Sequence, residues 1–288
     1  MKAEALQPTG SFKVRGAWNH LSTLSHKQKK RGVLALSAGN HGRAVAWAAQ
    51  RFSIERTVIL MPTGGPSFKV ESIRQQGADI VFFDPHTVDR QEMLRHWTEE
   101  EGLHFVPPFD DPLIIAGAGT VAMEMVEDAR KSGVTIDAFF AACSGGGLVA
   151  GSALSLEALS PATELWAVEP EDFDDTARSL EAGQRVTLPT GGRTICDTLM
   201  SPTPGKITFE INRNRIKGVV RARDELAKRG MMAAFSEFGL AAEPSGALAL
   251  GAVLADRSLT RNRTVAVVLS GRNVSPADYL SCLQGIED

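Results

Sequence analysis

Short apolar runs alternate along this chain with stretches of helical spacing. The helical stretches include residues 44–52, 68–76 and 117–131, where apolar side chains recur every three or four positions. The apolar runs are rich in the β-branched and aromatic residues of strands, and they occupy residues 33–36, 57–60, 79–83, 103–106, 138–141, 165–168 and 264–269. Because strands that alternate with helices pair in parallel and are covered by those helices, we expect a doubly wound α/β fold.

The charge balance and the short apolar runs argue against several classes of partner. A net charge of −3 and a pI near 6.1 give no electrostatic reason to bind nucleic acid or an anionic membrane. No apolar run approaches the roughly 20 residues that span a bilayer, and the first residues lack a signal-peptide core. Cys143, Cys196 and Cys282 lack CxxC spacing, so neither a disulfide framework nor a zinc site is indicated. We therefore expect a cytoplasmic protein.

Three turns that follow predicted strands are candidates for chemistry, because open α/β sheets bind ligands at the carboxyl ends of their strands. They are residues 37–42, 143–148 and 270–273. The run of glycines at 145–147 leads into an apolar helical stretch, so its backbone N–H groups can converge on an anion such as phosphate. A plain strand–helix turn is the alternative. The run lacks GxGxxG spacing and a GK[ST] ending, which disfavours dinucleotide and P-loop sites.

Lys13 lies between Phe12 and Val14, at the start of a predicted helix. Most lone lysines are solvated surface charges. A lysine desolvated in such a place has a lowered pKa and can act as a nucleophile or a base. The residues alone leave both interpretations open.

Residues 7–17, 37–42, 144–148 and 269–273 together resemble, in the same order, the signatures of the fold-type II pyridoxal-5′-phosphate enzymes, in the serine/threonine dehydratase and serine racemase branch. The resemblance spans essentially the whole chain. It implies a tryptophan synthase β-like fold, with two open parallel-sheet domains and the cofactor in the cleft between them. It also implies a Schiff base on Lys13, with Phe12 against the cofactor ring, Asn40 at the ring 3′-oxygen and Ser270 at the ring nitrogen. The phosphate would be held by the amides of Ser144, Gly145, Gly146, Gly147 and Leu148.

The same resemblance places the substrate carboxylate on Ser37, the Ala38 amide, Asn40 and His41. Racemases of this branch carry a serine, the second acid/base, where this chain has Ala38. Because alanine has no proton to exchange, we expect β-elimination of L-threonine, L-serine or a related β-hydroxy amino acid, giving a 2-oxo acid and ammonia. The alternatives are serine racemisation, hydroxyaspartate dehydration, β-replacement, or an inactive truncated PLP-binding subunit.

The acidic segment 169–175 is a candidate metal site. Five acids in seven residues usually form a solvated loop. Metal-dependent members of the family, however, use a glutamate, a carbonyl four residues later and an aspartate two further on, which here are Glu169, Phe173 and Asp175. Oxygen donors of this kind suit Mg²⁺ or another hard divalent cation.

The resemblance also predicts how the chain is divided. Residues 1–31 and 113–288 would form a large PLP-binding domain, and residues 32–112 a small mobile domain that closes over the substrate. Relatives carry an additional N-terminal segment, so the N-terminus is expected to be short. No C-terminal regulatory domain is expected, and a homodimer is expected.

Overall fold

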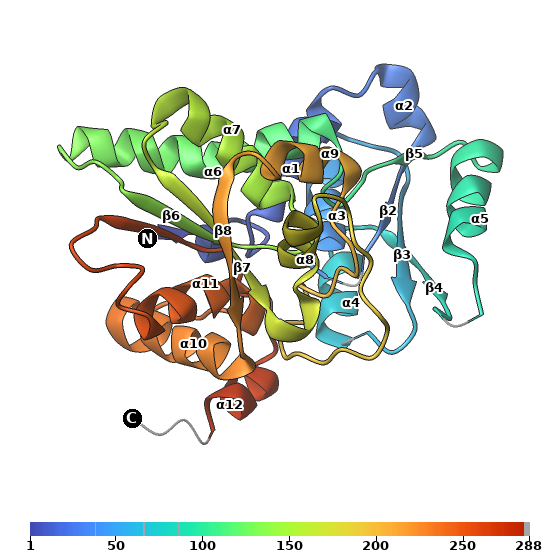
Figure 1. The fold of residues 1–288 in the computed structure, drawn as a ribbon. Helices are drawn as coiled ribbons and strands as arrows, with labels where there is room; N and C mark the ends of the chain where they lie inside the picture. The colour runs from blue at the N-terminus through green and yellow to red at the C-terminus, as the bar shows by residue number, and fades with distance from the viewer. Residues whose placement is uncertain (38, 66, 86, 285–288) are drawn as a thin grey trace.

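The computed structural model describes residues 1–37, 39–65, 67–85 and 87–284, and these residues form two parallel sheets (Figure 1). The larger sheet has the strand order β1-β9-β6-β7-β8, and the smaller has the order β4-β3-β2-β5. All the strand pairs within them are parallel, which confirms the predicted α/β class. The strands are β1 (Lys2–Ala3), β2 (Val33–Leu36), β3 (Thr57–Pro62), β4 (Asp79–Phe83), β5 (His104–Phe105), β6 (Ala138–Ala142), β7 (Glu164–Pro170), β8 (Ile216–Ala222) and β9 (Val265–Leu269).

Helices cover both faces of the larger sheet (Figure 1). Phe139 and Phe140 of β6 are both fully buried, and they point to opposite faces because side chains alternate along a strand. Phe139 packs in the layer of α6 and α7, and Phe140 packs in the layer of α10 and α11. Each such side chain contributes about 1.5–3 kcal/mol to folding by its burial. The covering helices are α6 (Pro112–Lys131), α7 (Gly147–Leu159), α10 (Asp224–Phe238) and α11 (Pro244–Ala255).

The smaller sheet is covered in the same way. Val33 and Ala35 of β2 pack towards α1, α3 and α4, whereas Leu34 packs on the other face, in the cluster that holds Met93 and Leu94 of α5. The helices on this side and in the connections are α1 (Lys13–Ser22), α2 (His26–Arg31), α3 (Asn40–Arg51), α4 (Ser67–Arg74), α5 (Arg90–Arg95), α8 (Asp175–Ala182), α9 (Lys206–Asn212) and α12 (Pro276–Leu283). Among the described residues, no helix is long and apolar enough to cross a membrane.

Two strands of the larger sheet are absent from the sequence prediction. β8 is an edge strand that carries Lys217 and Arg221 on exposed positions, so it lacks the apolar run of a central strand. β1 has only two residues and is held by parallel pairing with β9. The smaller sheet draws its strands from residues 33–105 alone. The domain boundaries near residues 32 and 112 stay a prediction.

Candidate active site

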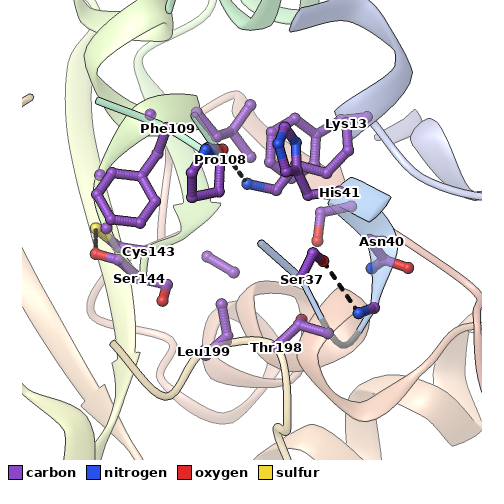
Figure 2. A pocket seen from close by; sticks show the side chains of 18 of the residues that line it. Lys13, Ser37, Asn40, His41, Pro108, Phe109, Cys143, Ser144, Thr198 and Leu199 are labelled. Carbon is purple, nitrogen blue, oxygen red and sulfur yellow. Dashed lines mark hydrogen bonds between the residues drawn. The ribbon is translucent and has the colours of Figure 1, made fainter. Parts of the chain in front are cut away.

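A cavity of about 460 Å³ lies where the carboxyl ends of β2, β6 and β9 meet between the two sheets (Figure 2). The predicted cofactor and substrate residues that the structure describes all line this one cavity, namely Phe12, Lys13, Ser37, Asn40, His41, Ser144, Gly145, Gly146, Gly147, Leu148 and Ser270. Ala38 lies outside the described residues, and Glu169, Phe173 and Asp175 are not in the lining. The individual roles of the lining residues stay predictions.

Lys13 is the first residue of α1, and its amine projects into the cavity (Figure 2). Its Nζ donates a hydrogen bond to the Pro108 carbonyl at 2.7 Å and lies 5.2 Å from the centre of the Phe12 ring. Burial lowers the pKa of Lys13 to about 8, because a charged amine is poorly solvated there. The neutral amine, which a nucleophile or a base requires, is therefore far more available near neutral pH than it would be at the usual lysine pKa.

The glycine turn between β6 and α7 is pressed against Phe109. A Cβ atom built on Gly145 would lie 2.3 Å from a ring atom of Phe109. Gly146 has φ = +91°, a backbone conformation that residues other than glycine rarely adopt. The turn opens directly into α7, which begins at Gly147. The backbone N–H groups at the start of a helix, together with its dipole, form an anion site. This cradle therefore fits a phosphate group.

Asn40 is held by two residues beside the larger sheet, Glu243 before α11 and Asn273 after β9. Its Nδ2 donates to the Glu243 carboxylate at 2.7 Å, and its Oδ1 accepts from Asn273 Nδ2 at 2.6 Å. Burial raises the pKa of Glu243 to about 7, and its Oε2 has no hydrogen-bond partner among the described atoms. The network fixes the orientation of the Asn40 amide at the cavity wall and links the two sheets.

His41 is buried and neutral. Its Nε2 lies 2.9 Å from the Val106 carbonyl, and because a carbonyl only accepts hydrogen bonds, this nitrogen carries the proton. Burial, and then the charge of Lys13, lower the pKa of His41 to about 3. The imidazole therefore offers no positive charge to a substrate carboxylate. The free N–H groups at the start of α3, beside the Ser37 hydroxyl that accepts from the Gly39 amide, remain suitable for an anion.

Three residues with no local sequence signal complete the cavity. Phe109 forms the wall behind the glycine turn. Lys69 of α4 donates to the carboxylate of Asp197, which belongs to the segment between α8 and α9, so the ion pair bridges the two sheets. Lys69 is buried, and its amine lies 3.9 Å from the position that a Cβ of Gly39 would take. Such contacts join residues far apart in the chain.

The predicted metal residues lie outside the cavity, at the junction of β7 and α8. Glu169 and Asp175 are both fully buried, so they do not form a solvated loop. The Glu169 carboxylate accepts the N–H groups of Thr176 and Ala177 at 3.1 and 3.0 Å, whereas both oxygens of Asp175 have no hydrogen-bond partner among the described atoms. A buried carboxylate without a partner is costly, and a hard cation would satisfy it.

A metal at this junction would need a further ligand. The described residues hold no cluster of three or more histidine, cysteine or acidic side chains arranged for a metal. Carbonyl, hydroxyl or water oxygens would have to complete the two carboxylates, and Phe173, the predicted carbonyl ligand, lies between them in the chain, in the short helix η3 (Glu171–Phe173). The donor set is compatible with a hard divalent cation.

Comparison with known proteins gives consistent matches over nearly the whole chain. Residues 1–271 match the family model described as pyridoxal-phosphate dependent enzyme. An L-threo-3-hydroxyaspartate ammonia-lyase of Pseudomonas sp is 37% identical over 99% of this chain and 88% of its own length. A serine racemase of Schizosaccharomyces pombe is 34% identical over 96% of this chain and 84% of its own length.

Solved structures agree in fold. The crystal structure of the T.th. threonine deaminase superposes with a TM-score of 0.87 at 39% identity, covering 94% of this chain and 86% of that one. The structure of maize serine racemase gives a TM-score of 0.89 at 31% identity, covering 96% of this chain and 84% of that one. The fold-type II architecture predicted from the sequence is thereby confirmed. Together with the buried amine, the glycine cradle and the family match, these likenesses show that the chain belongs to the family of pyridoxal-phosphate dependent enzymes.

Proposed function

We propose that this enzyme catalyses β-elimination of a β-hydroxy amino acid to a 2-oxo acid and ammonia. The observation that carries the proposal is the placement of the Lys13 amine and the glycine turn of α7 in one cavity, with the start of α3 beside them. A lyase of this kind needs an amine, a phosphate cradle and a carboxylate site within reach of one small molecule. The ammonia-lyase name of the 37% identical relative supports the same reaction class.

The residues present fit pyridoxal 5′-phosphate. Lys13 would hold it covalently, residues 144–148 would hold its phosphate, and Asn40 and Ser270 would contact its ring. When bound, this cofactor supplies an electron sink that acidifies the Cα–H bond of an amino acid. Ser270, directly after β9, offers a hydroxyl and no carboxylate, so the ring nitrogen would lack an anionic partner. The cofactor would then withdraw electrons from Cα only moderately.

The chain's own groups then determine what becomes of the Cα proton. The neutral Lys13 amine removes that proton, and the β-hydroxyl takes up a proton and leaves as water. Racemisation would need a second proton donor at Cα on the face opposite Lys13. Ala38 cannot act as one, and the imidazole of His41 is neutral, with its proton committed to the Val106 carbonyl. Elimination is therefore the favoured outcome over racemisation.

We further propose a divalent cation held by Glu169, Asp175 and the Phe173 carbonyl, a small domain of residues 32–112 that closes over the substrate, a homodimer, and a cytoplasmic location. The orphan oxygens of Asp175 support the cation. The bridging ion pair of Lys69 and Asp197 supports a closed arrangement of the two sheets.

The proposed function is tested by incubating the protein with pyridoxal 5′-phosphate and L-serine, L-threonine or L-threo-3-hydroxyaspartate, and measuring 2-oxo acid and ammonia. The variant Lys13→Ala should lose at least about 10³-fold in kcat, because Lys13 acts on the Cα proton. After reduction with borohydride, which makes a Schiff base permanent, this variant should also lack the covalently attached cofactor that mass spectrometry detects in the wild type. Lys27→Ala, a lysine on the exposed face of α2, is the control and should keep both. Release of D-serine in place of a 2-oxo acid would overturn the proposal in favour of racemisation.

A further inference from the structure

A second cavity, of about 560 Å³, opens from the active-site cavity towards solvent. The two share Phe109, Ser144, Asp197 and Thr198 in their walls, so the outer cavity is the vestibule of the inner one. Three basic side chains from separate segments line the outer cavity. Arg90 opens α5 beside the smaller sheet, Arg185 follows α8, and Lys206 opens α9. We refer to Arg90, Arg185 and Lys206 as the basic vestibule.

The cations of the basic vestibule are not neutralised by neighbouring acids. In the part of the chain that the structure describes, no carboxylate lies within ion-pair distance of any of the three. Arg185 donates through Nε to the Pro204 carbonyl at 2.8 Å, which fixes its side chain without removing its charge. All three residues are exposed, as charges that attract a ligand from solvent must be.

The two carboxylates in the same walls are already occupied. Asp110 accepts the first backbone N–H groups of α9, from Lys206, Ile207 and Thr208, at 2.9, 2.8 and 3.2 Å. Asp197 is paired with Lys69. The three cations of the basic vestibule outnumber Asp110, the one acid in these walls that has no cationic partner, so the mouth of the active site is positive although the whole chain has a net charge of −3. A positive cleft on a negatively charged protein indicates an anionic ligand, because a charged cleft raises the local concentration of ligands of the opposite sign.

Lys69 brings a hydrogen-bond donor to the inner cavity, although its charge is balanced by that of Asp197. Its amine lies beside Gly39, in the loop where the substrate carboxylate is proposed to bind. An ammonium group has three N–H donors, and the bond to Asp197 uses one of them. Lys69 can therefore donate to an anionic group of the substrate and still hold Asp197.

These charges separate the candidate substrates. L-serine and L-threonine are neutral zwitterions and gain little from a positive cleft. An amino acid with a second carboxylate carries a net charge of −1 and is attracted by it. We propose that the substrate is a β-hydroxy amino acid with a second carboxylate, which the basic vestibule attracts and whose distal carboxylate binds Lys69. This inference rests on the proposed function. The Cα proton and the β-hydroxyl leave, water hydrolyses the released enamine, and the products are a 2-oxo dicarboxylate and ammonia.

The test compares kcat/KM of the holoenzyme for L-threo-3-hydroxyaspartate and for L-serine. This constant is chosen because it includes substrate entry and excludes product release. The wild-type enzyme should favour the dicarboxylate. In the triple variant Arg90→Gln, Arg185→Gln, Lys206→Gln the ratio of the two constants should fall about tenfold or more, since steering contributes a factor of that order. Raising the ionic strength should lower the wild-type ratio and leave that of the triple variant nearly unchanged.

Arg261→Gln is the matched control. Arg261 is exposed in the loop before β9, at the amino end of the sheet and away from the cavity, so its removal should leave the ratio unchanged. Lys69→Gln should raise KM for the dicarboxylate by about tenfold, as expected for loss of a charged hydrogen bond of about 1.4 kcal/mol or more, and should raise KM for L-serine much less. Equal losses for both substrates in Lys69→Gln would mark Lys69 as purely structural.

The two proposals fail in different ways. A wild-type enzyme that prefers L-serine or L-threonine, or a triple variant with an unchanged ratio, would overturn the dicarboxylate inference while leaving β-elimination intact. Absence of a 2-oxo acid from all three amino acids, with the cofactor bound, would overturn both.

Discussion

Gly145 has no room for a side chain, because the Phe109 ring occupies that space. Gly145→Ala should push the turn away from its phosphate-binding geometry, at about 1–3 kcal/mol for overpacking. The dissociation constant for pyridoxal 5′-phosphate should then rise by about tenfold or more. Equilibrium titration followed by the cofactor's absorbance measures this change.

The double variant Gly145→Ala, Phe109→Ala removes the ring atoms that the new methyl group would meet. If the clash is the cause, the double variant should bind the cofactor more tightly than Gly145→Ala alone, a coupling that a double-mutant cycle isolates. Additive losses would show that Gly145 acts through something other than Phe109.

At the residue scale, sequence alone could locate the groups that stand in local motifs. Lys13 opens a helix, and the glycine turn and Ser270 follow strands, so each carries a local signal. Lys69 and Glu243 carry none. Their partners, Asp197 and Asn40, are 128 and 203 residues away in the chain, and only the folded structure brings them together.

At the element scale, the junction of β7 and α8 predicts a response to a cation. Asp175 begins α8, and its buried oxygens lack partners among the described atoms. Millimolar Mg²⁺ should raise the free energy of unfolding, by about 2.7 kcal/mol when free Mg²⁺ is a hundred times its dissociation constant. Asp175→Asn should abolish this gain. Chemical denaturation with and without Mg²⁺ measures it.

Asp172→Asn is the control for the cation. Asp172 lies in the same acidic segment but is exposed, and its carboxylate accepts the Arg193 N–H at 2.9 Å. This variant should keep the full gain from Mg²⁺. An equal gain in Asp175→Asn and in the wild type would place any bound Mg²⁺ elsewhere.

A chain of hydrogen bonds joins four elements where the two sheets meet. His20 of α1 lies 3.0 Å from the Asp111 carboxylate before α6, and its Nε2 lies 2.8 Å from His104 Nε2 of β5. Gln28 of α2 lies 3.3 Å from the other nitrogen of His104. With both imidazoles neutral, Gln28 donates to His104, His104 donates to His20, and His20 donates to Asp111, so every polar group in the chain has a partner.

This chain of hydrogen bonds predicts a loss of stability in acid. Burial, and then electrostatic interaction with the neighbouring His20, lower the pKa of His104. As the pH falls, the unfolded protein therefore binds a proton before the folded protein does. The contribution is complete above the unfolded value of about 6.5 and is lost as the pH falls below it, towards the lower folded pKa. His41, whose pKa is lowered to about 3, acts in the same direction.

His104→Gln keeps a donor for His20 and removes the titration. The free energy of unfolding should fall less between about pH 7.5 and about pH 5.5 than it does in the wild type, with the His41 contribution remaining. His26→Gln, an exposed histidine of α2, should retain the wild-type dependence. An identical pH dependence in all three proteins would show that His104 is not a source of the acid sensitivity.

The elements themselves were predictable to the extent that burial shapes their composition. Central strands such as β6 are buried on both faces and therefore read as continuous apolar runs. β8 has a solvent-exposed edge and carries charges, so its composition does not separate it from a loop. The turns that follow β2, β6 and β9 were identified because parallel topology places ligands at these strand ends.

At the scale of the whole molecule, the two parallel sheets follow from the alternation of runs, but their mutual placement does not. Residues on opposite sides of the cavity fix that placement, through Asn40 with Glu243, Lys69 with Asp197, and Arg43 with Asn273 at 2.7 Å. Hydrophobic periodicity specifies which face of an element is buried. It does not specify which distant polar groups will pair.

Because both sheets contribute residues to one cavity, binding of pyridoxal 5′-phosphate should stabilise the molecule as a unit. The glycine turn and Ser270 belong to the larger sheet, and Asn40 follows β2 of the smaller one. Cofactor in hundredfold excess over its dissociation constant adds about 2.7 kcal/mol, which corresponds to several degrees in Tm for a chain of this size. Thermal unfolding followed by near-ultraviolet circular dichroism measures the shift.

Pyridoxal without phosphate can still react with Lys13 but cannot use the cradle at α7, so its shift in Tm should be much smaller. Equal shifts for the two ligands would contradict the assignment of the glycine turn as the phosphate site.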